Sequence, residues 1–161
     1  MQNIDLICIG KMNAAYLRPV WPSTRNDWAA SANFRIVELP EVQIADKNAS
    51  DKQIAKALQK EGEAILASVR KGVYLVALCV EGKQVSSEDL AAMIADRAMS
   101  GAGDMAFVIG SSHGLDDSVK RAAQARISLG RITLPHQLAR LVLTEQLYRA
   151  CTINAGMKYH K

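Results

Sequence analysis

The run Val73-Tyr-Leu-Val-Ala-Leu-Cys-Val80 constrains the fold of this chain more than any other segment. It contains no charged residue, and its eight positions match the usual length of a strand rather than that of a helix. Strands that are covered on both faces of a parallel sheet have near-continuous apolar sequences of this kind. The run therefore predicts a buried strand in a mainly parallel sheet, ended by Glu81-Gly-Lys83.

Predicted strands and helices alternate in the sequence on either side of this strand. Short apolar runs that end at glycine or proline predict three more strands, Ile4–Ile9, Phe34–Leu39 and Met105–Ile109. Helices are expected from about Ser50 to Val69, from Ser86 or Ser87 to about Met99, and from Asp116 to Ala125. This alternation predicts an α/β fold, with a mainly parallel sheet flanked by helices.

Local signals define several of these segments further. Ser50-Asp-Lys-Gln53 has the sequence of a capping box, which opens the first long helix. The residues expected to face inward on the predicted helices are Ile54, Leu58, Ile65, Leu66, Val119, Ala122 and Ala123. A helix could start at Asn13–Arg18, but the prolines that follow should cut it short, and Trp21 and Trp28 are expected to act as packing anchors.

The last third of the chain is expected to be extended at first and then to form a helix from about Pro135 to Cys151. Thr133 is a candidate cap, and proline is tolerated in the first turn. Two apolar stripes run along this helix, Leu138/Leu141/Val142 and Ala139/Leu143/Leu147/Ala150. Because a surface helix needs only one stripe, they predict either a central helix of one domain or a helix that also packs against a second subunit.

The charge of the chain is unevenly distributed. The formal net charge is +4, but the segment Ser118–Lys161 carries a net +7 and the preceding 117 residues a net −3. A basic segment of this kind indicates either a polyanionic partner or a solvated basic surface without one. The helical residues Glu145 and Arg149 are spaced for an i,i+4 ion pair.

Composition excludes several classes of protein. The chain is 49% hydrophobic and 22% charged, which is typical of a globular protein, and no apolar run is long enough to span a bilayer. The start lacks the basic segment of a secretory signal. Cys8, Cys79 and Cys151 lie in apolar segments, so we expect reduced core residues in a cytoplasmic protein. No spacing of cysteine and histidine predicts a metal site.

Ligands of open α/β sheets bind beyond the carboxyl ends of the strands. Three segments are expected to converge there, Leu78–Gly82, Gly110–Leu115 and Leu129–Leu134. The turn Gly110-Ser-Ser-His-Gly114 matches neither the dinucleotide fingerprint nor the Walker A spacing. Redox and kinase-type nucleotide enzymes are therefore disfavoured. The same sequence is also typical of a plain tight turn without a ligand.

A set of motifs resembles the bacterial large-subunit ribosomal RNA pseudouridine N3-methyltransferases, which belong to the SPOUT class. The motifs are Thr133-Leu-Pro-His-Gln137, Glu145-Gln-Leu-Tyr-Arg-Ala150, Tyr159-His-Lys161, Val108–Leu115, Val76–Lys83 and Ser50–Ile54. The resemblance covers nearly the whole chain and is weakest from Met12 to Ala32. It implies a single domain over residues 1–161 with a C-terminal trefoil knot, which general pattern rules would not predict.

The resemblance implies a site for S-adenosylmethionine. By position, its residues would be Leu78, Gly110, Leu129, Gly130, Arg131, Ile132, Thr133 and Leu134. Backbone groups can recognise adenine while apolar side chains cover its faces. Two departures affect this site: Ser111 stands where relatives usually have glycine, and Gly130 where they usually have serine.

The implied reaction is methyl transfer to N3 of a pseudouridine in ribosomal RNA, free or in an assembled ribosome. His160 is the candidate general base, Tyr159 could stack on the target base, and Arg149 could hold the RNA backbone or polarise a uracil carbonyl. Without the resemblance, these terminal residues would be interpreted as a frayed end. Asn154-Ala-Gly156 is a candidate joint that lets the tail reach a site, in its own chain or across a homodimer.

Two alternatives remain open at this point. One is a related knotted methyltransferase acting on transfer RNA. The other is a ribosome-binding protein that has lost catalysis through Ser111, Gly130 and the altered segment Met12–Ala32.

Overall fold

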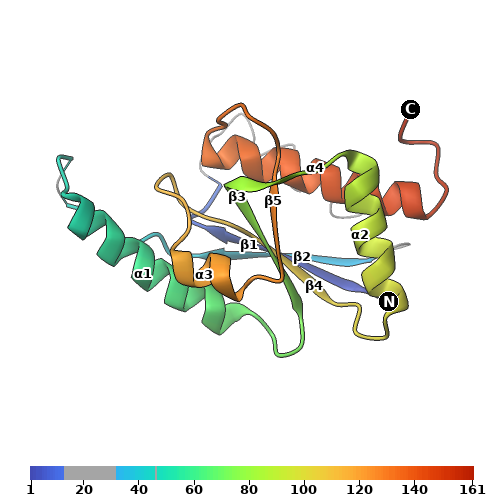
Figure 1. Ribbon diagram of the computed structural model, residues 1–161, viewed down its shortest axis with the longest axis horizontal. Helices are drawn as coiled ribbons and strands as arrows, with labels where there is room; N and C mark the ends of the chain where they lie inside the picture. Colours follow the sequence, from blue (N-terminus) through green and yellow to red (C-terminus); the bar gives the residue numbers. More distant parts are fainter. Residues whose placement is uncertain (13–31, 46) are drawn as a thin grey trace.

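The computed structural model describes residues 1–12, 32–45 and 47–161. Its framework is a five-stranded sheet in the order β2-β1-β4-β3-β5, in which every pair of neighbouring strands is parallel. Figure 1 shows helices on both faces of this sheet. The predicted α/β fold with a mainly parallel sheet is confirmed. The helix start at Asn13–Arg18 and the packing roles of Trp21 and Trp28 lie outside the described residues.

The strands are β1 (Asn3–Ile9), β2 (Asn33–Leu39), β3 (Tyr74–Gln84), β4 (Met105–Ile109) and β5 (Ala125–Ser128). The four strands predicted from apolar runs all form, with ends within a residue or two of expectation except in β3. That strand does not stop at Glu81-Gly-Lys83 but continues to Gln84. Its pairing with β5 shifts register between Leu78 and Lys83, so an irregularity lets the strand resume beyond its apolar half.

The helices are α1 (Asp51–Ser68), α2 (Ser87–Met99), α3 (Asp117–Ala122) and α4 (His136–Asn154). The predicted capping box is confirmed, because the Ser50 side chain accepts from the Gln53 N–H and the Gln53 side chain accepts from the Ser50 N–H. Of the two serines proposed to cap α2, Ser86 does so, and Asp89 completes a second capping box. Side chains thus satisfy orphan backbone donors at the start of both helices.

Each face of the sheet has its own core of buried side chains. Side chains alternate along β1, so Ile4, Leu6 and Cys8 point to one face and Ile7 and Ile9 to the other. The first face packs against α2 and α4, which contact each other, and the second packs against α1 and α3. The central strands β1 and β4 are almost completely buried, as expected for a sheet covered on both sides.

Several local predictions are wrong in detail. The helix expected over Asp116–Ala125 is the shorter α3, capped by Asp116, and Ala122 is exposed rather than inward because the helix ends there and leads into β5. Thr133 does not cap α4: Pro135 occupies the cap position, and no side chain bonds to the first turn. Ile54 and Leu58, expected to face inward, are only half-buried.

The two apolar stripes of α4 differ in burial. Ala139, Leu143, Leu147 and Ala150 are buried in the core of their own chain. Leu138, Leu141 and Val142 are half-buried. Only the stripe of Leu138, Leu141 and Val142 therefore has apolar surface left for a further partner.

Arg140 fixes α4 to the sheet and was not predicted as a buried residue. Its side chain is 1% exposed. The guanidinium donates to the carbonyl oxygens of Ile9 (3.0 Å) and Gly10 (3.1 Å) and to Glu38 Oε2 (3.1 Å). The Glu38 carboxylate also accepts from the Met12 N–H. One cation thus joins α4 to the carboxyl ends of β1 and β2.

Replacing Arg140 by methionine keeps the apolar stem but leaves the carbonyl groups of Ile9 and Gly10 without this donor and the Glu38 carboxylate without its ion-pair partner. We expect the free energy of unfolding to fall by about 3 kcal/mol, the usual scale for breaking a buried charged pair. Urea unfolding at fixed protein concentration, followed by circular dichroism, measures this. Arg121→Met, at an exposed position on α3, is the matched control and should change stability by less than about 0.5 kcal/mol. Equal stability of the two variants would contradict the role given to Arg140.

Candidate functional site

A cavity of about 760 Å³ lies at the carboxyl edge of the sheet. The three segments predicted to converge there all contribute to its walls, the first from within β3 and the other two from the loops after β4 and β5. All eight residues expected to hold the cofactor line it: Leu78, Gly110, Leu129, Gly130, Arg131, Ile132, Thr133 and Leu134. The structure therefore brings the predicted set together in one place.

The turn after β4 requires glycine at its first position. A Cβ atom on Gly110 would lie 2.2 Å from the carbonyl oxygen of Gly114, closer than any real contact. The turn is closed by a bridge between Ser111 and Gly114, whose N–H donates to the Ser111 carbonyl (2.9 Å). Gly110 is thus needed first by the fold of its own turn, which in turn shapes the cavity wall.

Ser111 is accommodated without backbone strain, since every described residue with positive φ is glycine. Its hydroxyl donates to Glu61 Oε1 (2.9 Å), and the Val42 N–H donates to the other oxygen of that carboxylate (3.0 Å). Glu61 is 4% exposed. A serine where relatives usually have glycine therefore ties the cavity loop to α1 and to the segment after β2.

Glu61 was not predicted as a supporting residue, although the sequence holds a signal for it. It lies three residues after Leu58 and four before Ile65, on the stripe of α1 that faces the sheet. An acid on an inward stripe needs a buried hydrogen-bond donor. That requirement predicts a polar contact with a neighbouring loop, here the one that carries Ser111.

The loop after β5 lines the cavity from Leu129 to Leu134. Gly130 adopts φ +127°, a backbone conformation that residues other than glycine rarely take. The Ser128 hydroxyl donates to the Gly130 carbonyl (3.0 Å) and accepts from its N–H (3.2 Å), which holds this conformation. Nearby, the large apolar side chains Ile132 and Val80 are 82% and 81% exposed at the cavity wall. The site thus combines a glycine turn held by Ser128 with exposed apolar surface.

Charged groups of the cavity include an ion pair that was not predicted. Lys120 Nζ lies 2.6 Å from Glu81 Oε1. The hydrogen bond with Lys120 lowers the pKa of the Glu81 carboxyl, and the same bond raises the pKa of Lys120. Both groups are therefore charged at neutral pH. Cys79 lines the same wall, and its partial burial raises the pKa of the thiol.

The three candidate catalytic residues form a second group, at the far end of α4. Arg149 binds Glu145 through Nη2 and Oε1 (2.6 Å), which confirms the predicted i,i+4 pair. The Tyr159 hydroxyl donates to the same oxygen (3.1 Å), and its ring lies edge-on against Tyr148. The Arg149 guanidinium also lies over the Tyr159 ring, 4.8 Å from its centroid. The tail is thus docked on α4, which corrects the default interpretation of a frayed end.

His160 is held between two charged groups. Its Nε2 lies 2.8 Å from Glu88 Oε1, and its Nδ1 lies 3.4 Å from Arg149 Nη1. A carboxylate only accepts and a guanidinium only donates, so this arrangement favours the tautomer with hydrogen on Nε2 and a lone pair on Nδ1. Glu88, at the start of α2, was not predicted, and nothing in its sequence context indicates the contact.

The phenol of Tyr159, in the tail, and the guanidinium of Arg149, on α4, keep their ordinary protonation states. Burial, followed by the bond to Glu145, raises the pKa of Tyr159, so the phenol stays protonated at neutral pH. The bond to Glu145 likewise raises the pKa of Arg149. Tyr159 can therefore donate a hydrogen bond or stack, and of the three residues His160 alone has a basic lone pair.

The two groups of residues lie apart within one chain. Ala139 is the last residue of α4 that lines the cavity, and Arg149 follows ten residues later. At 1.5 Å per residue, this is a separation of about 15 Å along the helix. The cavity and the tail therefore do not meet within the described chain.

Metal-binding clusters and membrane-spanning helices are not found in the described part of the chain. Among residues 1–12, 32–45 and 47–161, no group of three or more His, Cys, Asp or Glu side chains is placed to hold a metal ion. Within the same ranges, no helix is both long and apolar enough to cross a membrane.

Comparison with known proteins identifies the family. A family model described as "Predicted SPOUT methyltransferase" matches residues 2–160. The ribosomal RNA large subunit methyltransferase H of Bifidobacterium animalis subsp. lactis is 43% identical over 159 residues, which cover 99% of each protein. Proteins of the same name from Streptococcus uberis and Clostridium novyi are each 42% identical, over 98% and 99% of this chain and 99% of their own lengths. These matches, together with the parallel sheet and its cavity, show that the chain belongs to the SPOUT methyltransferase family.

Proposed function

We propose that this protein transfers a methyl group from S-adenosylmethionine to N3 of a pseudouridine in large-subunit ribosomal RNA. Relatives that match almost the whole chain carry the name ribosomal RNA large subunit methyltransferase H. The observation that supports the proposal most is the convergence of all eight expected cofactor residues on one cavity. The partner is ribosomal RNA, free or in an assembled ribosome, and the protein acts in the cytoplasm.

The cavity has the size and lining that the cofactor needs. About 760 Å³ lies within the range of roughly 300–1,000 Å³ typical of small-molecule sites. Main-chain groups near Gly130 and Thr133 can read the adenine edge, and Ile132 and Leu134 can cover its faces. Glu81 and Lys120 offer opposite charges to the zwitterionic amino-acid part. When bound, S-adenosylmethionine supplies a methyl group that its sulfonium charge has already activated.

The tail supplies the groups that act on the acceptor. His160 takes the imide proton at Nδ1, and Glu88, bonded to Nε2, holds the required tautomer and stabilises the imidazolium that forms. Arg149 donates to a uracil carbonyl or a phosphate, and Tyr159 stacks on the target base. A positioned base typically contributes roughly 10²–10⁴-fold to the rate, and alignment of the reacting atoms contributes more.

A homodimer brings the tail to the cavity. Asn154 is fifteen residues beyond Ala139, or about 22 Å along α4, and the six residues from Ala155 to His160 span at most about 22 Å, only when they are fully extended. The tail of one chain therefore reaches its own cavity only by leaving Glu88 and Tyr148. The half-buried stripe of Leu138, Leu141 and Val142 provides apolar surface for a second copy, whose tail then completes the site.

The alternatives have less support. The relatives are named for ribosomal RNA, which argues against a transfer RNA acceptor. Ser111 has an ordinary φ and a buried partner, and Gly130 adopts a conformation suited to glycine, so neither departure distorts the cavity in a way that argues for lost catalysis.

Cofactor binding can be followed through Cys79. This half-buried thiol lines the cavity, whereas Cys8 and Cys151 are 0% and 4% exposed. Iodoacetamide should modify Cys79 alone in the folded protein, about tenfold faster for each pH unit through the neutral range because its pKa is raised. Saturating S-adenosylmethionine should slow the reaction, and a dinucleotide such as NAD should not. Mass spectrometry measures each site, and equal rates with and without S-adenosylmethionine would place the cofactor elsewhere.

The dimer is tested on the half-buried stripe of α4. Val142→Glu puts a charge into the proposed interface without entering the core, so sedimentation should change from a species of twice 17.5 kDa to a monomer. Ala67→Glu, at an exposed position on α1, is the control and should leave the dimer intact. Leu143 and Leu147 are unsuitable probes because both are fully buried in their own chain. A wild-type monomer at micromolar concentration would overturn the idea.

The tail is tested by methyl incorporation into ribosomes, free ribosomal RNA and transfer RNA. His160→Ala should lower the rate on the ribosomal acceptor by roughly 10²–10⁴-fold, with partial recovery at high pH as hydroxide replaces the base. Glu88→Gln should cause a smaller loss, because it weakens the hold on the imidazole without removing it. Cofactor affinity should be unchanged in both. Lys158→Ala, an exposed tail residue, is the control. Full activity after deletion of Tyr159–Lys161 would contradict the assigned roles.

A further inference from the structure

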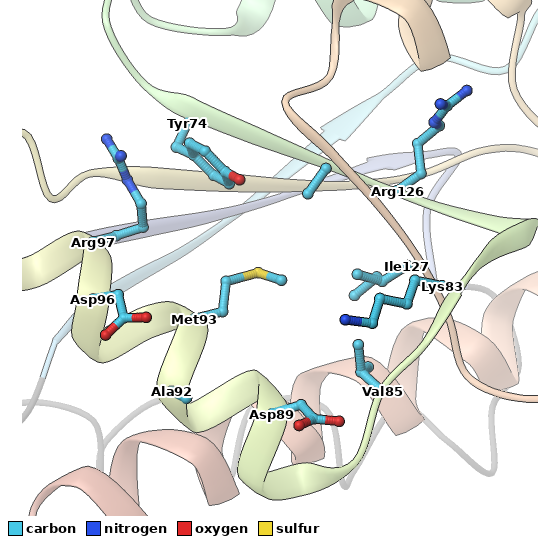
Figure 2. A pocket seen from close by; sticks show the side chains of 11 residues that line it. Tyr74, Lys83, Val85, Asp89, Ala92, Met93, Asp96, Arg97, Arg126 and Ile127 are labelled. Carbon is cyan, nitrogen blue, oxygen red and sulfur yellow. The ribbon is translucent and has the colours of Figure 1, made fainter.

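A second cavity, of about 370 Å³, lies between α2 and the end of the sheet formed by β3 and β5 (Figure 2). It shares no lining residue with the cavity at the carboxyl edge. No sequence motif predicts a role for it, and the proposed methyl transfer does not use it. Its lining nevertheless combines an apolar floor with a rim that carries several cations.

The floor is formed by side chains from both elements. Met93 and Val85 are half-buried, and Ile127 is 1% exposed. Tyr74 adds an aromatic ring, which carries the Arg97 guanidinium 4.5 Å from its centroid. Figure 2 shows Met93 reaching from α2 across the floor of the pocket, below Tyr74. A planar group could therefore lie against apolar and aromatic surface here.

The rim carries three cations and two acids. Asp89 is already engaged, because its carboxylate accepts from the Ser86 N–H in the capping box of α2, which lowers its pKa. Arg97 is partly engaged, since it donates to the Ala102 carbonyl (2.9 Å). Lys83 and Arg126 are exposed, and within the described part of the chain neither forms an ion pair. These two cations remain available to an anionic ligand.

Both available cations belong to adjacent strands. Lys83 pairs with Ile127 in the register of β3 and β5, next to Arg126 in the chain. Figure 2 shows the Lys83 ammonium group directed over the pocket toward α2, and Arg126 on the same side with its side chain pointing away from Met93. Because β5 is the edge strand of the sheet, a chain-like ligand can run along this side without displacing a neighbouring strand.

The pocket also adjoins the tail. Asp89 lines it, and Glu88, the preceding residue of α2, holds His160. Ser87 contacts Gln146 of α4, which fastens the start of α2 to the helix that carries the tail. A ligand in this pocket would therefore contact α2, the helix that also holds His160 through Glu88.

We infer that this pocket binds a nucleotide of the acceptor RNA that flanks the modified pseudouridine. The inference rests on the proposed function and extends it to a second RNA contact. The base would lie on Met93 and Tyr74, and Lys83 and Arg126 would neutralise the adjoining phosphates. A polyanion fits better than an acidic peptide because apolar floor and cationic rim match the alternation of base and phosphate, and single-stranded RNA is bound in this manner.

The charge contribution is tested by salt dependence. Binding to purified ribosomes is measured over a range of salt concentrations for Lys83→Gln, Arg126→Gln and the double variant. The slope of log affinity against log salt should fall by about 0.7 for each phosphate of single-stranded RNA that the variant no longer neutralises. Asp96→Asn, on the same rim, should strengthen binding, and Lys56→Gln, exposed on α1, should leave both affinity and slope unchanged. Slopes equal to that of the wild type would overturn the inference.

The occupancy of the pocket is tested by volume and by crosslinking. Ala92 is exposed on α2 and lines the pocket, so Ala92→Trp fills it without disturbing the core. The KM for ribosomes should rise while kcat at saturation and the affinity for S-adenosylmethionine stay close to wild type. A photoreactive benzoylphenylalanine at position 92 should crosslink to RNA. Crosslinks to a ribosomal protein or to a second copy of this chain would contradict the assignment.

These outcomes separate the inference from the proposed function. Wild-type protein that binds S-adenosylmethionine and methylates ribosomes, with unaffected Lys83, Arg126 and Ala92 variants, would remove the second RNA contact only. Wild-type protein without methyl transfer to any RNA would overturn the function itself.

Discussion

The buried guanidinium of Arg140 is the interaction on which the arrangement of this molecule depends. A cation at 1% exposure is stable only when its hydrogen bonds are made, and here the acceptors are the carbonyl oxygens of Ile9 and Gly10 at the end of β1 and the Glu38 carboxylate of β2. The requirement fixes both the position of α4 over the sheet and its rotation about its own axis. Since the cavity adjoins the first turns of α4 and the tail docks on its last ones, Arg140 sets the geometry of both halves of the site.

The sheet and most helices could be predicted because their signals are local. Apolar runs of strand length, punctuated by Gly10, Pro40 and Gly110, define three strands, and Ser50 with Gln53 defines the start of α1. Predictions failed where tertiary contacts decide. The second half of β3 forms because β5 offers a partner after a shift in register, which no property of Glu81-Gly-Lys83 reveals. Thr133 has the chemistry of a cap, but the turn that shapes the cavity leaves Pro135 at the cap position.

The candidate site was predictable in a different way. The eight cavity residues follow from the rule that ligands bind at the carboxyl edge, combined with a family resemblance that comparison confirms. The polar contacts that support them, Ser111–Glu61 and Glu88–His160, join residues 50 and 72 positions apart, and sequence spacing carries no information about such pairs. The arrangement into one domain, expected from the chain length, and the trefoil knot, implied by the resemblance, stay predictions.

In the proposed dimer, the separation of cavity and tail along α4 would let two differently impaired chains complement each other. Each site would take its cavity from one chain and its tail from the other, joined by a helix too stiff to shorten the distance. Two chains, one impaired only in its cavity and the other only in its tail, would each be inactive alone. Mixed as subunits, they would restore one complete site per hybrid dimer and leave the other doubly defective. Activity would then depend on which two chains form the dimer, and not on either chain alone.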